Sequence, residues 1–179
     1  MAKTPQTLSS LNSEKEEVDH LTAIKKLPAF RGVTLELISK LLESSVERFI
    51  LQGDFIFKQD DPASSLVIFS KGFAVECKRI GEVDCVVNFY DEISILGESS
   101  FLESCSRSTS LFANEDCWVI EIDNHCLKKF AFTNPDQFET LYMNLGRELG
   151  KKVLGINEKI NQANEMQFIR ESRIRWATY

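Results

Sequence analysis

Residues 97–110 read GESSFLESCSRSTS and contain the residue types in this chain that are best suited to bind a small polar ligand. Glu98 follows Gly97 and stands nine residues before Arg107, and small hydroxyl residues fill most of the places around them. A guanidinium can donate paired hydrogen bonds to a phosphate, and an ionised carboxylate accepts the proton of a hydroxyl. Alone, the same residues describe a polar surface loop equally well. The elements on either side must decide between a loop and a pocket.

Few residues suit catalysis or metal binding. His20 and His125 are the two histidines, and they lie in separate segments. The five cysteines are an odd number without Cys-x-x-Cys spacing, which predicts reduced thiols and neither disulfides nor a zinc site. No P-loop, dinucleotide fingerprint or Gly-x-Ser-x-Gly motif is present. We therefore expect a protein that is not an enzyme and that holds no metal.

The composition limits the classes of partner. With 179 residues, of which 43% are hydrophobic, the chain suits one domain with helical extensions. The net charge of −6 argues against a nucleic-acid binder, which would need a basic face. No signal peptide and no membrane-spanning apolar run is visible in the sequence. We expect a cytoplasmic location.

The hydrophobic pattern predicts helices, then strands, then helices. Residues 1–13 are polar and expected to be flexible, and residues 14–45 hold two predicted helices. Residues 46–123 contain short runs rich in Val, Ile and Phe, separated by turn residues. They predict a mainly β fold with flanking helices, an eight-stranded antiparallel jelly-roll β-barrel. The strands are expected at 46–51, 54–59, 65–70, 73–79, 84–90, 93–96, 108–114 and 117–122.

Residues 124–163 return to a helical pattern. A short helix capped by Asp123 or Asn124 precedes a long one that begins at Pro135. Apolar residues recur at three- and four-residue steps as far as Ile160, so helix 135–160 is expected to form a homodimer or to contact an effector protein. Residues 164–179 form a basic, amphipathic tail, which either docks a partner or packs on its own domain.

Residues 20–160 resemble the cyclic nucleotide-binding domain family, which includes the catabolite activator protein, protein kinase A regulatory subunits and nucleotide-gated channels. The stretch 49–76, FILQGDFIFKQDDPASSLVIFSKGFAVE, is similar to the opening strands of that family. The family's signature is a phosphate-binding cassette: a Gly-Glu pair, a short helix, and an Arg followed by a small residue. Gly97-Glu98 and Arg107-Ser108 fill those places, so residues 97–110 resemble the cassette.

The resemblance implies a regulatory sensor domain whose ligand is a cyclic nucleotide, without any further cofactor. Arg107, Ser108 and the N–H groups of a helical turn at 99–103 would hold the phosphate, and Glu98 the ribose 2′-hydroxyl. The long helix would cover the base near Leu145 or Leu149 and carry the signal by moving. The expected ligand-binding residues are Gly97, Glu98, Ser99, Ser100, Arg107, Ser108 and Thr109.

The cassette also departs from the common family pattern. Ser99, Ser100 and Ser106 replace residues that are usually apolar, alanine or proline, and Asp60 replaces a glycine before Asp61-Pro62. These changes keep open a second hypothesis, a scaffold for protein–protein interaction that binds no nucleotide. A metal-dependent jelly-roll enzyme is a remote third.

The choice of base rests on the residue after Arg107. In the family a threonine at that place often accompanies guanine, whereas here Ser108 takes it and Thr109 comes one place later. The sequence therefore favours cAMP over cGMP.

Overall fold

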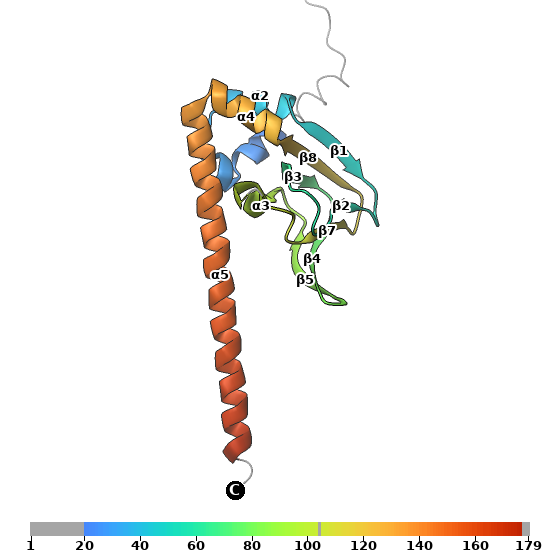
Figure 1. Cartoon of the computed structure of the whole chain (residues 1–179), viewed down its shortest axis with the longest axis vertical. Coiled ribbons are helices and arrows are strands. Elements are labelled where there is room, and N and C mark those ends of the chain that lie inside the picture. Colours follow the sequence, from blue (N-terminus) through green and yellow to red (C-terminus); the bar gives the residue numbers. More distant parts are fainter. Residues whose placement is uncertain (1–19, 104, 177–179) are drawn as a thin grey trace, which may run out of the picture.

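The computed structural model describes residues 20–103 and 105–176, with the side chains as far as residue 158 (Figure 1). Each of the eight predicted strands is present, with ends displaced by at most two residues. After a helical segment at residues 20–25, the elements are η1 (Pro28–Phe30), α2 (Leu35–Glu43), β1 (Val46–Ile50), β2 (Phe55–Phe57), β3 (Ser65–Lys71), β4 (Ala74–Ile80), β5 (Val83–Tyr90), β6 (Ser94–Leu96), α3 (Glu98–Glu103), β7 (Ser110–Ala113), β8 (Cys117–Asp123), α4 (Asn124–Thr133) and α5 (Pro135–Trp176).

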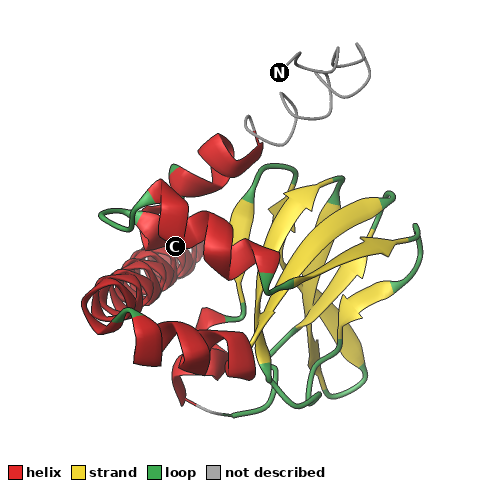
Figure 2. Cartoon of the chain, turned by 90° about the horizontal axis from the view of Figure 1, so that it is seen from above, coloured by secondary structure: helices red, strands yellow, loops and turns green. Residues whose placement is uncertain are grey.

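The strands form two antiparallel four-stranded sheets, in the orders β1-β8-β3-β6 and β2-β7-β4-β5. The jelly-roll prediction is confirmed, but the predicted closure into a barrel is wrong, since the two sheets stay separate in the part of the chain described. The reason is that β2 and β6 have only three residues each and offer too few ladder hydrogen bonds to join the sheets. The fold is therefore a sandwich with helices on one side (Figure 2).

Strand β3 is the centre of the core because it is buried on both faces. Leu66 and Ile68 point to the helices, whereas Val67 and Phe69 point to the second sheet. Burial on both faces explains the uninterrupted apolar run LVIF. A strand with one exposed face would instead alternate apolar and polar residues. Among the described residues, only one face of the second sheet is covered, and β5 is exposed along most of its length.

Helix α5 is anchored at its first turns and then runs past the sandwich (Figure 1). Leu141 and Leu145 are buried in the helical part of the core. The side-chain amide of Asn144 donates to the carbonyl oxygens of Ala29 at 3.1 Å and Arg31 at 2.7 Å. The helix was predicted to end before residue 164 but continues to Trp176, so its backbone includes most of the predicted tail.

Two further sequence predictions can be checked on the described residues. Of the two proposed caps for α4, Asp123 is the N-cap, because its Oδ1 accepts a hydrogen bond from the backbone N–H of Cys126 at 2.7 Å. Among the helices described, α5 included, none combines the length and the apolar character that crossing a bilayer requires. The prediction for residues 1–13 lies outside the described residues.

Candidate ligand-binding site

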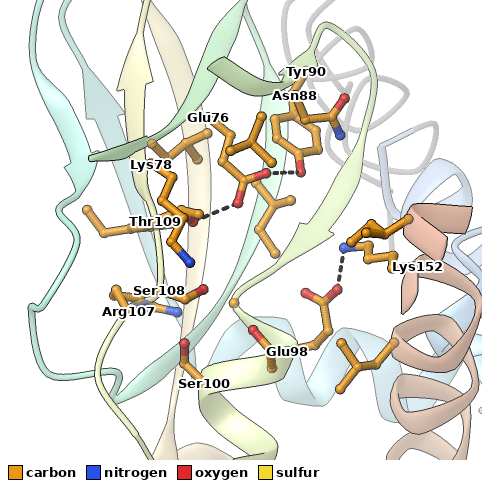
Figure 3. A pocket seen from close by; sticks show the side chains of 18 of the residues that line it. Glu76, Lys78, Asn88, Tyr90, Glu98, Ser100, Arg107, Ser108, Thr109 and Lys152 are labelled. Carbon is orange, nitrogen blue, oxygen red and sulfur yellow. Dashed lines mark hydrogen bonds and ion pairs between the residues drawn. The ribbon is translucent and has the colours of Figure 1, made fainter. Parts of the chain in front are cut away.

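A cavity of about 540 Å³ opens between β4, β5, the cassette and α5 (Figure 3). The fold brings together all seven residues that the sequence predicted to bind the ligand. Strand β6 ends at Leu96, α3 starts directly after the next residue, and β7 returns the chain to the second sheet. The predicted residues that line the cavity are Gly97, Glu98, Ser99, Ser100, Arg107, Ser108 and Thr109.

Arg107 is a buried cation with one donor group left over. It is 4% exposed, and its Nη2 donates to the carbonyl oxygen of Ser65 at 2.9 Å and to the Ser65 hydroxyl at 3.1 Å. Its guanidinium carbon lies 4.5 Å from the centre of the Phe57 ring. Burial lowers the pKa of the guanidinium from its ordinary value. Among the described residues, no hydrogen-bond acceptor faces Nη1. Because buried donors are rarely left unpaired, this atom is suited to an anionic ligand.

The backbone of Arg107 is held by the loop after β2. Asp60 N–H donates to the Arg107 carbonyl oxygen at 2.9 Å, and Arg107 N–H donates to that of Asp61 at 2.9 Å. Asp60 adopts a φ of 70°, in the left-handed region that glycine and, less often, Asp or Asn occupy. Asp60 therefore holds a conformation that glycine adopts more easily, in the loop that positions Arg107.

Gly97 permits the close approach of Arg107 to the start of α3. Its φ is +80°, and a Cβ atom added there would lie 2.0 Å from Arg107 Nη1. Any side chain at this position would push the guanidinium out of its place. The glycine of the Gly-Glu pair is thus required both by the backbone and by the space.

Glu98 is the other buried charge of the cassette and is joined to α5. It is 4% exposed, and its Oε1 accepts a hydrogen bond from Lys152 Nζ (Figure 3). Lys152 was not predicted from the sequence. It lies three residues after Leu149, which was predicted as a possible residue over the base. Because residues three apart share a helix face, this spacing could have placed Lys152 at the cavity. The pair links the cassette directly to the long helix.

The hydroxyl residues of the cassette have different roles. Ser100 is buried, and its hydroxyl donates to the Ser106 carbonyl oxygen at 3.2 Å, which fixes the turn after α3. Ser99 and Ser108 line the cavity. By helix geometry, the N–H groups at the start of α3 have no carbonyl partner within the helix, so they are available to a ligand. Thr109 donates its hydroxyl proton to Glu76 Oε1 at 2.7 Å.

Strands β4 and β5 supply polar residues that sequence reasoning missed. Tyr90 donates its hydroxyl proton to Glu76 Oε2 at 2.8 Å. Burial and then the Glu76 charge raise the pKa of Tyr90, so its hydroxyl stays protonated. Alternation along β4 places Glu76 and Lys78 on one face, and this alternation was the signal that could have found them. The missed residues that line the cavity include Phe57, Glu76, Lys78, Asn88, Tyr90 and Lys152.

Helix α5 forms the wall opposite β4 and β5. Leu149 lines the cavity, as one of the two sequence suggestions had it, whereas Leu145 is buried in the core. Val153 and Ile156 also line it and are 50% and 56% exposed. Apart from Lys152, the helical wall is therefore apolar, and it is largely open.

This geometry can be compared with known proteins. Residues 47–134, from β1 to α4, match the family model of the cyclic nucleotide-binding domain. This segment of the chain is a cyclic nucleotide-binding domain. The match ends before α5, so the helical wall of the cavity lies outside it.

The chain as a whole is similar to a curated protein and to solved structures. It is 22% identical to the cAMP-dependent protein kinase type II regulatory subunit of Drosophila melanogaster, over 90% of this chain and 48% of that protein. The catabolite activator protein of Thermus thermophilus superposes with a TM-score of 0.67 at 21% identity, covering 76% of this chain and 63% of that one. A cyclic nucleotide-binding domain from Methylobacillus flagellatus gives a TM-score of 0.71 at 17% identity, covering 83% and 84%. The structural likenesses show the fold, and the chain spans about half of the curated relative.

Proposed function

We propose that the cavity binds a 3′,5′-cyclic nucleotide and that the domain is a regulatory module, not an enzyme. The observation that carries the proposal is Arg107, whose buried Nη1 lacks a partner among the described residues while Gly97 and Glu98 lie beside it. The Drosophila relative is by its name a regulatory subunit of a cAMP-dependent kinase, which supports a regulatory role.

The phosphate is assigned to Arg107 and the start of α3. Arg107 keeps its Ser65 bonds through Nη2 and offers Nη1 to a phosphate oxygen. The free N–H groups of the first turn of α3 and the Ser108 hydroxyl supply further donors. A phosphate bound there would compensate the buried positive charge of Arg107. Proteins tolerate a buried charge when an opposite charge pairs with it.

The ribose is assigned to Glu98. Its Oε1 is engaged by Lys152, so Oε2 is the oxygen that accepts the 2′-hydroxyl proton. Ligand binding and the ion pair can then coexist, and Lys152 would hold α5 over the sugar. This arrangement supports a signal that passes from the cassette to α5 through a shift between open and closed positions of the helix.

The remaining sequence predictions complete the proposal. No cofactor is required besides the nucleotide, and the chain acts on a homodimer partner or an effector protein through α5, whose Leu154 is 64% exposed. The preference for cAMP over cGMP rests on Ser108 alone. The cytoplasmic location and the alternative of a scaffold that binds no nucleotide both stay predictions.

A titration with a fluorescent cyclic nucleotide tests the proposal. We expect saturable binding by the wild type and a loss of at least about tenfold in affinity for Arg107→Ala, because the charge-assisted hydrogen bond from Nη1 to the phosphate disappears. Arg79→Ala is the matched control, since Arg79 is exposed and pairs with Asp84 in the β4–β5 hairpin. Unchanged binding by Arg107→Ala would show that the nucleotide does not bind at Arg107, and no binding by a folded wild type would favour the scaffold.

A further inference from the structure

The wall of the cavity beyond Arg107 and Glu98 determines which base fits. With the phosphate at Arg107 and the 2′-hydroxyl at Glu98, the part of the cavity left for the base is bounded by β4 and β5 on one side and by α5 on the other. Helix α5 offers mainly apolar side chains there, namely Leu149, Val153 and Ile156. The polar groups that can read a base therefore come from the strand side.

Three of these groups form one hydrogen-bonded cluster, which we name the acceptor cluster: Glu76, Tyr90 and Thr109 (Figure 3). Tyr90 and Thr109 both donate their hydroxyl protons to the Glu76 carboxylate, at 2.8 and 2.7 Å. A carboxylate has about four lone-pair positions, so Glu76 can still accept further hydrogen bonds. Because the two hydroxyl protons are used, Tyr90 and Thr109 also present only lone pairs to the cavity.

The two purine bases differ in what they offer to such a surface. Guanine carries two adjacent donors, N1–H and the N2 amino group, which match the two oxygens of one carboxylate. Adenine carries a single amino donor beside N1, which is itself an acceptor and would face the lone pairs of the cluster. A site built from buried polar groups rejects a ligand that leaves those groups unpaired.

We propose that the acceptor cluster makes this domain select the guanine base, and hence cGMP over cAMP; the inference rests on the proposed function of the same cavity. Lys78 lies on the same face of β4 as Glu76 and lines the cavity, so it can donate to the guanine O6. Selection of cGMP contradicts the preference for cAMP that was predicted from Ser108. That prediction considered no residue of β4 or β5.

Titration calorimetry of the wild type with cGMP, cIMP and cAMP tests the inference. Hypoxanthine, the base of cIMP, keeps N1–H and O6 but lacks the amino group of guanine. We expect cGMP to bind at least about tenfold more tightly than cAMP, with cIMP in between. This comparison requires no variant, so it does not depend on how a substitution affects folding.

Glu76→Gln then assigns the preference to the cluster. Its amide presents one acceptor and one donor group, which matches the adenine edge, so the ratio of cGMP to cAMP affinity should fall by at least about tenfold. Glu82→Gln is the matched control, because Glu82 is exposed in the turn between β4 and β5, outside the cavity. Thermal melts establish that both variants are folded.

Each result separates the inference from the proposed function. If the wild type binds cAMP as tightly as cGMP, or if Glu76→Gln leaves the ratio unchanged, the inference is overturned while nucleotide binding stands. If a folded wild type binds none of the three nucleotides, the proposed function itself fails.

Discussion

Two walls of the cavity are built in different ways: the cassette wall, formed by residues 97–110, and the helical wall, formed by α5. The cassette wall is buried and fixed: Glu98 and Arg107 are each 4% exposed, and hydrogen bonds to Asp60, Asp61 and Ser65 hold Arg107 at both its backbone and its side chain. The helical wall is exposed. Among the described residues, it is joined to the cassette by the ion pair between Lys152 and Glu98.

Under the proposed function, the cassette would recognise the ligand and α5 would respond to it. Side chains that the fold already holds in place cost little reorganisation when a ligand binds, so the cassette would supply affinity. Apolar side chains left half exposed gain from being covered, so the wall formed by Val153 and Ile156 is the part that a ligand would draw inward. The match to the family model also separates these two walls, because it includes the cassette and stops before α5.

The strongest way to break the cassette wall without touching a charge is Gly97→Ala. The added Cβ meets Arg107 Nη1 and must displace it, so we expect cyclic-nucleotide affinity to fall by at least about tenfold. Gly81→Ala is the control, because Gly81 also has a positive φ but has open space around its Cβ position. Both variants should lose about 1–2 kcal/mol of stability in thermal melts, and only Gly97→Ala should lose affinity. Equal affinities for the two variants would show that the position of Arg107 does not matter.

The role of Glu98 can be tested by combining the Glu98→Gln variant with a 2′-deoxy cyclic nucleotide. The wild type should prefer a cyclic nucleotide to its 2′-deoxy analogue by about tenfold, because the hydroxyl donates to a carboxylate. In Glu98→Gln this preference should shrink to about threefold or less, as a neutral acceptor makes a weaker bond. Glu103→Gln, at the exposed end of α3, should behave like the wild type in the same calorimetric titrations. An unchanged preference in Glu98→Gln would remove Glu98 from the sugar site.

A smaller effect is expected where the two walls meet. Lys152→Met leaves the buried carboxylate of Glu98 without its cation and releases α5, so affinity should fall by about three- to tenfold. Lys151→Met removes the adjacent lysine, which is exposed and pairs with Glu148 on the helix surface, and should change affinity little. Binding curves that coincide for the two variants would mean that the ion pair does not couple the walls.

The outer face of α5 should affect assembly and not affinity. Light scattering should find a dimer for the wild type and a monomer for Leu154→Glu, which places a charge in the exposed apolar stripe. Thr22→Glu adds the same charge at an exposed site outside α5 and should stay dimeric. A wild type that remains monomeric with and without nucleotide would contradict the predicted homodimer.

The sequence predicted what depends on local pattern. Alternating apolar residues and turn residues located the eight strands, and the Gly-Glu and Arg-Ser pairs located the cassette. The barrel closure was wrong because it depends on ladders between strands that are distant in the chain and only three residues long. Lys152 was missed because its position depends on where α5 crosses the cassette, which the buried contacts of Leu141, Asn144 and Leu145 decide.

Glu76 was missed for a different reason. An acid at the middle of an alternating strand is usually assigned to the solvent face, and the sequence alone does not show which face of β4 closes a cavity. Its bonds to Tyr90 and Thr109 join three segments that are separated in sequence, and this contact carries the inference about the base.

A crystal structure of the chain with cGMP tests the central claim most directly. The account predicts a phosphate oxygen within hydrogen-bonding distance of Arg107 Nη1 and the ribose 2′-hydroxyl on Glu98, with the Lys152 ion pair retained. A nucleotide bound elsewhere on the molecule, or one in the cavity whose phosphate does not contact Arg107, would contradict it.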